Sequence, residues 1–262
     1  IVIGMKYLYS NMPYSDVGNY TFDTYLDYVQ QGIYLWENSP YVKNYPELYF
    51  LNYVLFHRTN DEEIKPCRTY FWEKIKDKVQ GKTMVEAALE INHWCAGEVM
   101  YQGTDMRTGS ALEIYRSGVG RCGEEAVFVV NVMRSAGIPA RPVYVPRWSH
   151  CDDNHAWVEV WCDGDWHYLG ACEPEAVLDK SWFTNAASRA MMIGSRWYDR
   201  AMPDEKVIGK DGMNRIINLL GKYAKTRWIT ITVEDLDGTP AAGAKVRAEV
   251  MNYGEFSPIA IM

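Results

Sequence analysis

A cysteine at a turn between two glycines is the first feature of this sequence that points to chemistry. Cys122 lies in the tract Gly120-Arg121-Cys122-Gly123, at the start of a segment with helical spacing of apolar residues. The first turn of a helix presents unpaired N–H groups and a positive dipole end, which stabilise a thiolate. The neighbouring Arg121 is expected to lower the pKa of the thiol further. Most free cysteines are small buried apolar residues, but the glycines and charges here favour a nucleophile.

A histidine farther along the chain is the candidate base. His155 begins the alternating run H-A-W-V-E-V-W, which predicts a strand. An imidazole placed there can accept the proton of the Cys122 thiol; the alternative is a hydrogen-bonded structural histidine. Residues 150–153 and His155 are rich in metal-ligand types, but their spacing matches no common zinc finger. We therefore predict no metal site.

The elements around these two residues have an α+β order. Apolar spacing predicts a helix over 122–137, which ends at a glycine. Alternation and β-branched or aromatic content predict strands over 141–147, 155–162 and 165–172, with a hairpin turn between the last two. The segments before residue 120 have mostly helical patterns. Helices therefore precede an antiparallel sheet.

The order of these motifs resembles the transglutaminase-like superfamily of papain-like cysteine enzymes. The resemblance covers residues 110–173 and is carried by G-x-G-R-C-G-E-x-A, R-S-A-G-I-P-A-R and H-A-W-V-E-V-W. This superfamily includes transglutaminases, microbial proteases and peptide N-glycanases. The resemblance implies a papain-like core, in which a nucleophile helix packs on an antiparallel sheet, and a Cys-His-Asp triad. Cys122 takes the position of the nucleophile and His155 that of the base, with no cofactor required.

The third member of the implied triad is absent from its usual place. The family pattern W-x-x-x-D, counted from Trp166, places glycine at the position of the aspartate, Gly170. The nearest carboxylate is Glu173, in a G-A-C-E tract similar to the D-x-C-E tract of peptide N-glycanases. On a continuing strand, positions 170 and 173 face opposite ways, but a turn before Pro174 can return the longer side chain. We predict Glu173 as the residue that orients His155; the weaker alternatives are Glu175, Asp152 and Asp153.

An oxyanion hole is also expected. The backbone N–H of Cys122 can supply one donor. The family usually adds an aromatic or amide side chain from the segment before the nucleophile. Trp94, Tyr101 and Gln102 lie in that segment, and the sequence leaves the choice among them open.

Changes of texture along the chain suggest three parts. Residues 1–68 form an aromatic-rich helical region, residues 69–225 the transglutaminase-like core, and residues 226–262 an accessory module. In the last part Ile229, Ile231 and Val233 alternate before a turn at 237–238. This pattern is typical of the first strands of a β-sandwich, although too few residues remain to close one.

Composition excludes some functions. The chain has 262 residues with 27 Lys+Arg against 34 Asp+Glu, a net charge of -7. The lack of a basic surplus argues against nucleic-acid binding, and no apolar run is long enough to span a membrane. Six scattered cysteines without a CxxC pair leave the redox compartment open.

The sequence therefore predicts a cysteine-dependent enzyme that cleaves amide bonds through a thioester, with hydrolysis favoured over transglutamination. Its expected partner is a protein or peptide substrate, with a glycoprotein as one candidate. The alternative is a catalytically inactive domain that binds protein or glycan. In that case, glycine in place of the family aspartate at Gly170 would reflect the loss of catalysis. The appended module favours a multi-domain, extracytoplasmic protein that is secreted, periplasmic or surface-anchored.

Overall fold

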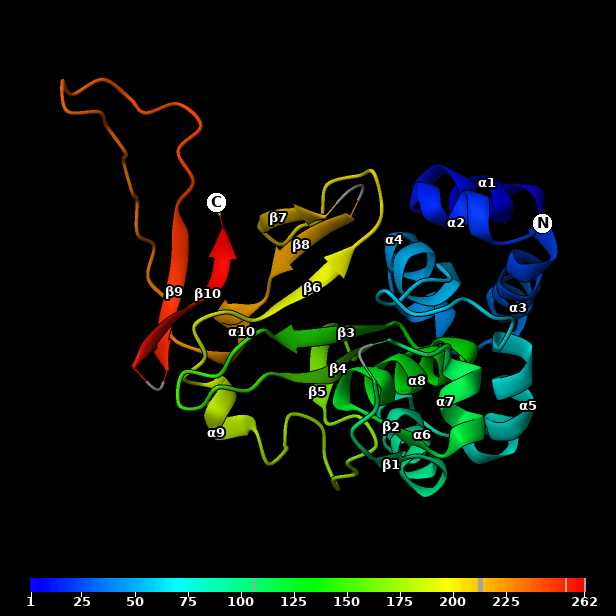
Figure 1. Cartoon of the computed structure of the whole chain (residues 1–262). Helices are drawn as coiled ribbons and strands as arrows, with labels where there is room; N and C mark the ends of the chain where they lie inside the picture. The colour runs from blue at the N-terminus through cyan, green and yellow to red at the C-terminus, as the bar shows by residue number, and fades with distance from the viewer. Residues whose placement is uncertain (106, 212–213, 253, 262) are drawn as a thin grey trace.

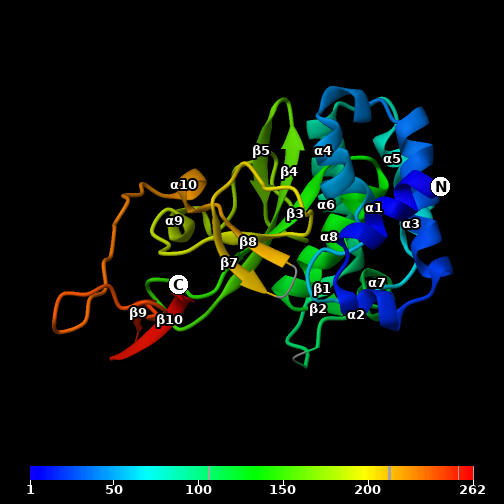
Figure 2. The ribbon, with the colours of Figure 1, turned by 90° about the horizontal axis from the view of Figure 1, so that it is seen from above.

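The computed structural model describes residues 1–105, 107–211, 214–252 and 254–261. Helices gather at one side of the molecule, an antiparallel sheet occupies the middle, and a C-terminal hairpin lies at the opposite end (Figures 1 and 2). This arrangement confirms the predicted combination of helices with an antiparallel sheet.

The N-terminal region is helical, as predicted. It contains α1 (Val2–Asn11), α2 (Tyr14–Asn19), α3 (Phe22–Asn38), the short helix η1 (Val42–Asn44), α4 (Glu47–Phe50) and the π-helical turn η2 (Leu51–Leu55). Pro13 and Pro46 stand at the caps that begin α2 and α4, where the missing N–H of proline costs no helical hydrogen bond. The side chains of Tyr25 and Val29 on α3 are fully buried. This region therefore contributes to the core and is not a loose extension.

Four further helices lead to the predicted nucleophile. They are α5 (Arg68–Val79), α6 (Met84–Glu98), α7 (Ala111–Ser117) and α8 (Cys122–Ser135). A capping box of Thr83 and Glu86 begins α6, as its sequence spacing indicates. Helix α8 is the centre of the domain, because every residue from Glu124 to Ser135 is buried. A helix covered on all sides is held firmly, and this fixes the position of its first turn.

One face of α8 packs on the main sheet. The sheet has the strand order β5-β4-β3-β6-β8-β7 in the described part of the chain, with every neighbouring pair antiparallel. Its strands are β3 (Ala140–Val145), β4 (His155–Cys162), β5 (Asp165–Leu169), β6 (Gly194–Trp197), β7 (Val207–Asp211) and β8 (Asn214–Asn218). A separate parallel pair, β1 (Met100–Tyr101) and β2 (Val119–Gly120), leads directly into α8. The sequence-predicted helix and three strands are therefore all present, each within a few residues of its expected bounds.

The two faces of the sheet carry different residues. Ala156, Val158 and Val160 of β4 belong to the cluster that contains α8. Trp157 faces the other way, into a second cluster that includes Trp148 and Phe183. The short helices α9 (Thr184–Ala187) and α10 (Leu220–Tyr223) lie on this second side. Strand β4 thus separates an aliphatic helix-facing side from an aromatic one.

The C-terminal part differs from the expected start of a sandwich. The residues at 228–233 are extended without a strand ladder, and Ile229 is 80% exposed. Strands β9 (Arg247–Asn252) and β10 (Glu255–Ile261) form an antiparallel hairpin. A strand needs a partner to be stable. After the predicted turn at 237–238, the Ala241 N–H donates to the Val233 carbonyl at 3.0 Å and one bridge joins Glu234 to Pro240, but the described residues form no ladder along 228–233. The side-chain amide of Asn252 donates to the carbonyls of Trp148 and Cys151, each at 3.1 Å, so the hairpin is attached to the loop before β4.

No helix in the described ranges is both long enough and apolar enough to cross a membrane.

Candidate active site

Cys122 occupies the first position of α8 and is partly exposed. The chain reaches this position through β2, whose Gly120 carbonyl accepts the Gln102 N–H at 2.9 Å. A Cβ added at Gly120 would lie 3.1 Å from the Cβ of Glu124. The glycine therefore lets the chain pass close to the first turn of the helix. Glu124 also accepts the Arg121 N–H at 3.0 Å, which caps that turn.

The sulfur of Cys122 lies against the start of β4. The backbone amides of Ala156 and Gly123 act to lower the pKa of the thiol, but burial is the largest influence and leaves the pKa raised. Arg121, which was expected to lower the pKa of the thiol, is not among the groups that shift it most. Its guanidinium instead donates to Thr104 Oγ1 at 2.9 Å and to the Arg107 carbonyl at 3.1 Å. The thiol at rest is therefore neutral.

His155 is the first residue of β4 and directly precedes Ala156, whose amide acts to lower the pKa of the Cys122 thiol. Its imidazole packs among aromatic rings, with ring centres 4.8 Å from Trp182 and 5.0 Å from Phe183. Burial lowers the pKa of this imidazole to about 4, against a smaller opposing influence of Asp153. Nε2 is buried and has no hydrogen-bond partner. Among the described residues no hydrogen bond joins Cys122 and His155, and the imidazole lies with the aromatic rings on the face of β4 opposite α8.

Glu173 returns to the position of the missing aspartate. A tight turn follows β5, in which the Glu173 N–H donates to the Gly170 carbonyl at 3.1 Å and Cys172 has a positive φ of 56°. A Cβ added at Gly170 would lie 2.9 Å from the Cβ of Glu173 and 3.1 Å from its Cδ, and closer still to a carboxylate oxygen. The carboxylate therefore fills the space that a side chain at Gly170 would take. The turn expected before Pro174 accounts for this return.

The register of the sheet places this carboxylate on the side of His155. Leu169 pairs with Val158, so Gly170 comes level with Trp157, and alternate residues of a strand share a face. His155 and Trp157 therefore lie on that face with the carboxylate of Glu173.

Trp182 connects the carboxylate to the imidazole. Its indole Nε1–H lies 2.9 Å from both oxygens of Glu173, while its ring packs on His155. Among the described residues there is no direct hydrogen bond between Glu173 and His155. Of the weaker candidates, Asp152 pairs with Arg147 and Glu175 pairs with Lys180, whereas the charge of Asp153 acts to raise the pKa of His155. Glu173 is linked to the imidazole through the indole of Trp182.

Sequence reasoning missed a second carboxyl group at the site. Glu125 lies one turn after Cys122 on α8 and is buried. Burial raises its pKa to about 8, and the negative charges of Glu173 and Glu124 add to this effect. The signal available was its spacing of three residues from Cys122, which puts both on one side of the helix. Its carboxyl therefore holds a proton at neutral pH.

The structure separates the three candidates for the side-chain donor of the oxyanion hole. Trp94 is part of the helical core, where its ring is stacked on Tyr115 with centres 5.9 Å apart. Tyr101 pairs with Gly120 across β1 and β2, and Gln102 follows it with an exposed side chain. The structure thus places Tyr101 and Gln102, but not Trp94, beside the entry to the nucleophile.

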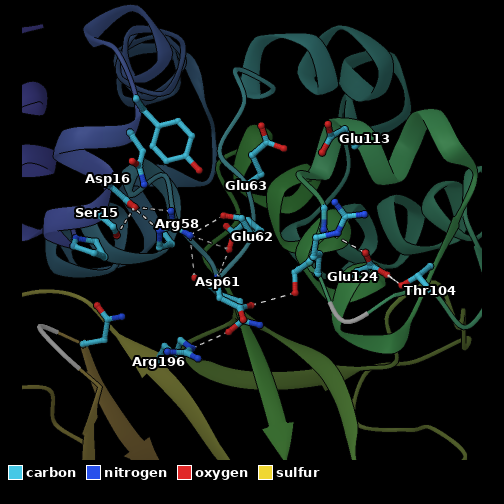
Figure 3. A pocket seen from close by; sticks show the side chains of 18 of the residues that line it. Ser15, Asp16, Arg58, Asp61, Glu62, Glu63, Thr104, Glu113, Glu124 and Arg196 are labelled. Carbon is cyan, nitrogen blue, oxygen red and sulfur yellow. Dashed lines mark hydrogen bonds and ion pairs between the residues drawn. The ribbon is translucent and has the colours of Figure 1, made fainter.

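A charged cavity of about 870 Å³ borders the same end of α8 (Figure 3). It lies between α2, residues 58–63, residues 104–109 and the sheet. Glu124 and Thr104 line its edge near Arg121, and Arg196 lines it from β6. This cavity is open to solvent, and Cys122, His155 and Glu173 are not among its lining residues. Within the described ranges, no group of three or more His, Cys, Asp or Glu residues is arranged to hold a metal ion.

Comparisons with known proteins give one match to a family model and two alignments to solved structures. Residues 73–171 match the family model of the transglutaminase-like superfamily. A structure from Cytophaga hutchinsonii described as a "Putative Cysteine Protease" aligns at 16% identity with a TM-score of 0.36, covering 58% of this chain and 57% of that one. Red sea bream transglutaminase aligns at 16% identity with a TM-score of 0.30, covering 56% of this chain and 26% of that one.

The chain thus spans about half of the first of these proteins and a quarter of the second. Comparison with curated protein sequences gives no match. The family match includes the nucleophile helix, the histidine strand and the strand before Glu173. Residues 73–171 are therefore the part of the chain that is similar to the transglutaminase-like superfamily.

Proposed function

We propose that this protein is a cysteine-dependent hydrolase of amide bonds in proteins or peptides. The observation that carries the proposal is the packing of α8, which begins at Cys122, against β4, which begins at His155. This packing brings the helix that carries the nucleophile against the strand that carries the base. The superfamily of residues 73–171 supports a cysteine-based enzyme in general terms.

The reaction begins from a neutral thiol and a neutral imidazole. His155 accepts the thiol proton as the sulfur of Cys122 attacks the substrate carbonyl carbon, so a C–S bond forms and an electron pair moves to the carbonyl oxygen. The Cys122 N–H at the start of α8 donates to this oxygen. When the carbonyl reforms, the C–N bond breaks and the amine leaves with the proton of the imidazolium. Water, deprotonated by His155, then hydrolyses the thioester.

Glu173 stabilises the imidazolium that forms during both steps. Its charge is held near His155 by the indole of Trp182. A carboxylate in this role fixes the imidazole and favours its charged form. Glu125, protonated at neutral pH, limits the negative charge beneath the thiol.

The fate of the thioester decides between hydrolysis and transglutamination. The test incubates the protein with a peptide library and with a fluorescent primary amine such as dansylcadaverine. New peptide N-termini, found by mass spectrometry and absent with Cys122→Ala or His155→Ala, are the expected result. Incorporation of the amine into glutamine-containing peptides would instead indicate a transglutaminase. A Glu175→Gln variant serves as the control, because that carboxylate pairs with Lys180.

An inactive binding domain is the second candidate. It is favoured by the absence, in the described residues, of any hydrogen bond that joins Cys122, His155 and Glu173. The raised pKa of the thiol and the lowered pKa of the imidazole agree with it. Iodoacetamide labelling of Cys122 that is no faster than for an ordinary thiol and is unaffected by His155→Ala would favour this candidate.

We further propose an extracytoplasmic, multi-domain setting, supported by the hairpin appended after the core. Fractionation of cells that express the full natural gene would test it, and recovery in the cytoplasm would contradict it.

A further inference from the structure

Tyr144 occupies a position of β3 next to the nucleophile. It pairs directly with Ala156 of β4 and with Gly194 of β6. Side chains directly opposite each other in antiparallel strands share a face and lie about 5 Å apart at Cβ. Tyr144 therefore lies on the face of the sheet that carries α8, opposite Ala156, which belongs to the cluster against which Cys122 packs.

The exposure of Tyr144 is unusual for its place in the sheet. Val143 and Val145 on either side are fully buried, whereas Tyr144 is 48% exposed. Gly194, opposite it, has no side chain to cover the ring. The phenol hydroxyl has no hydrogen-bond partner among the described residues. A tyrosine inside a sheet that keeps an open ring and an unused hydroxyl is available to a ligand.

The charges around the phenol also point to the site. Burial raises the pKa of Tyr144, the negative charge that Cys122 can carry raises it further, and Arg147 and Arg196 oppose this. The phenol of Tyr144 is therefore within electrostatic influence of both the nucleophile and Arg196. The phenol keeps its proton at neutral pH and can act as a donor.

We propose that the hydroxyl of Tyr144 donates a hydrogen bond to the carbonyl oxygen of the substrate as it becomes an oxyanion at Cys122. The Cys122 N–H is the other donor. This inference rests on the proposed function, because an oxyanion forms only when the thiol attacks a carbonyl. It assigns the side-chain donor to a strand behind the nucleophile, whereas Gln102 is the exposed candidate on the segment before it.

Two reagents separate this role from a merely structural one. p-Nitrophenyl acetate acetylates the thiol through a tetrahedral oxyanion: a C–S bond forms, the C–O bond breaks and p-nitrophenolate leaves. Iodoacetamide alkylates the same sulfur by displacing iodide, and no oxyanion forms. The ratio of the two rates at Cys122, read by mass spectrometry of its peptide, therefore reports oxyanion stabilisation independently of thiol reactivity.

The variants are Tyr144→Phe, Gln102→Ala and the matched control Tyr34→Phe, a tyrosine of α3 with 43% exposure. We expect Tyr144→Phe to slow acetylation by about a hundredfold, as for the loss of one oxyanion donor, with alkylation changed less than twofold. The control should leave both rates unchanged. Equal slowing of both reactions, an unchanged acetylation rate, or a loss seen only with Gln102→Ala would overturn the inference.

The same data distinguish failure of the proposed function. If Cys122 of the unmodified protein is acetylated no faster than the other cysteines, the hydrolase proposal and the inference both fail. If it is acetylated rapidly and Tyr144→Phe behaves like the unmodified protein, only the role of Tyr144 is refuted.

Discussion

The carboxylate of Glu173 is predicted to act from the position that an aspartate at Gly170 would have. The perturbation is Glu173→Gln, which keeps the shape of the side chain and removes its charge. The indole of Trp182 lies 2.9 Å from both carboxylate oxygens and its ring centre is 4.8 Å from that of His155, so Trp182 links the carboxylate to the imidazole.

The magnitude follows from the cost of charging His155. Burial lowers its pKa from 6.5 to about 4, so the imidazolium needs a compensating charge during catalysis. As a general scale, two opposite charges about 7 Å apart at an effective dielectric constant of about 20 attract each other by about 2.4 kcal/mol, which corresponds to roughly a fiftyfold change in rate. We therefore expect Glu173→Gln to slow acetylation of Cys122 by p-nitrophenyl acetate to about that extent.

A relocated carboxylate provides the sharper test. The double variant Gly170→Asp with Glu173→Ala removes the overlap that a side chain at Gly170 would have with Glu173 and restores a carboxylate from the strand itself. It should recover much of the lost acetylation rate, while Glu173→Ala alone should not. Glu175→Gln should leave the rate unchanged. Full activity of Glu173→Gln, or failure of the double variant while it remains folded by circular dichroism, would refute the reasoning.

Three further predictions concern charge and burial. Glu125 raises the pKa of Cys122, so Glu125→Gln should move the pH midpoint of iodoacetamide labelling downward; an upward shift would contradict this. The folded-state pKa of His155 is about 4 against 6.5 in the unfolded chain, so its contribution to stability is present above pH 6.5 and is lost, by up to about 3 kcal/mol, as the pH falls towards 4. Urea unfolding between pH 7 and pH 4 should therefore be less pH-dependent in His155→Gln, and an equal dependence would argue against a buried neutral imidazole. Arg141 and Glu159 form a buried ion pair at 2.8 Å. Glu159→Gln should lower the free energy of unfolding by about 3 kcal/mol, because it leaves the buried guanidinium without a charged partner on β4. A loss below about 1 kcal/mol would show that Glu205, which also pairs with Arg141, is enough to stabilise the guanidinium.

Local patterns predicted the elements that hold the reacting groups. The glycines around Cys122 and the apolar spacing after it marked the start of α8, and alternation after His155 marked β4. The possibility that a turn returns Glu173 followed from Pro174, since a proline ends a central strand. Each of these inferences depends on a few neighbouring residues in the chain.

Tertiary surroundings decided what the sequence could not. Arg121 was expected to activate the thiol, but its side chain binds Thr104 and the Arg107 carbonyl, which are distant in sequence. Alternation at Ile229 and Ile231 suggested a strand, but a strand forms only beside a partner, and the described chain supplies none. Trp182 stood out only as one aromatic residue among many until the fold placed it between a carboxylate and an imidazole.

The neutral resting pair has a consequence for how the enzyme would discriminate between water and substrate. Burial disfavours both the thiolate of Cys122 and the imidazolium of His155, so separating charge before a substrate binds is costly. In the mechanism proposed above, once the carbonyl accepts the electron pair from sulfur, the negative charge moves to the carbonyl oxygen, where backbone and side-chain donors stabilise it, and Glu173 stabilises the imidazolium. Charge separation then becomes favourable only along the reaction path. The buried site therefore keeps the thiol protonated when empty and restricts its reactivity to carbonyl groups that fit beside the start of α8.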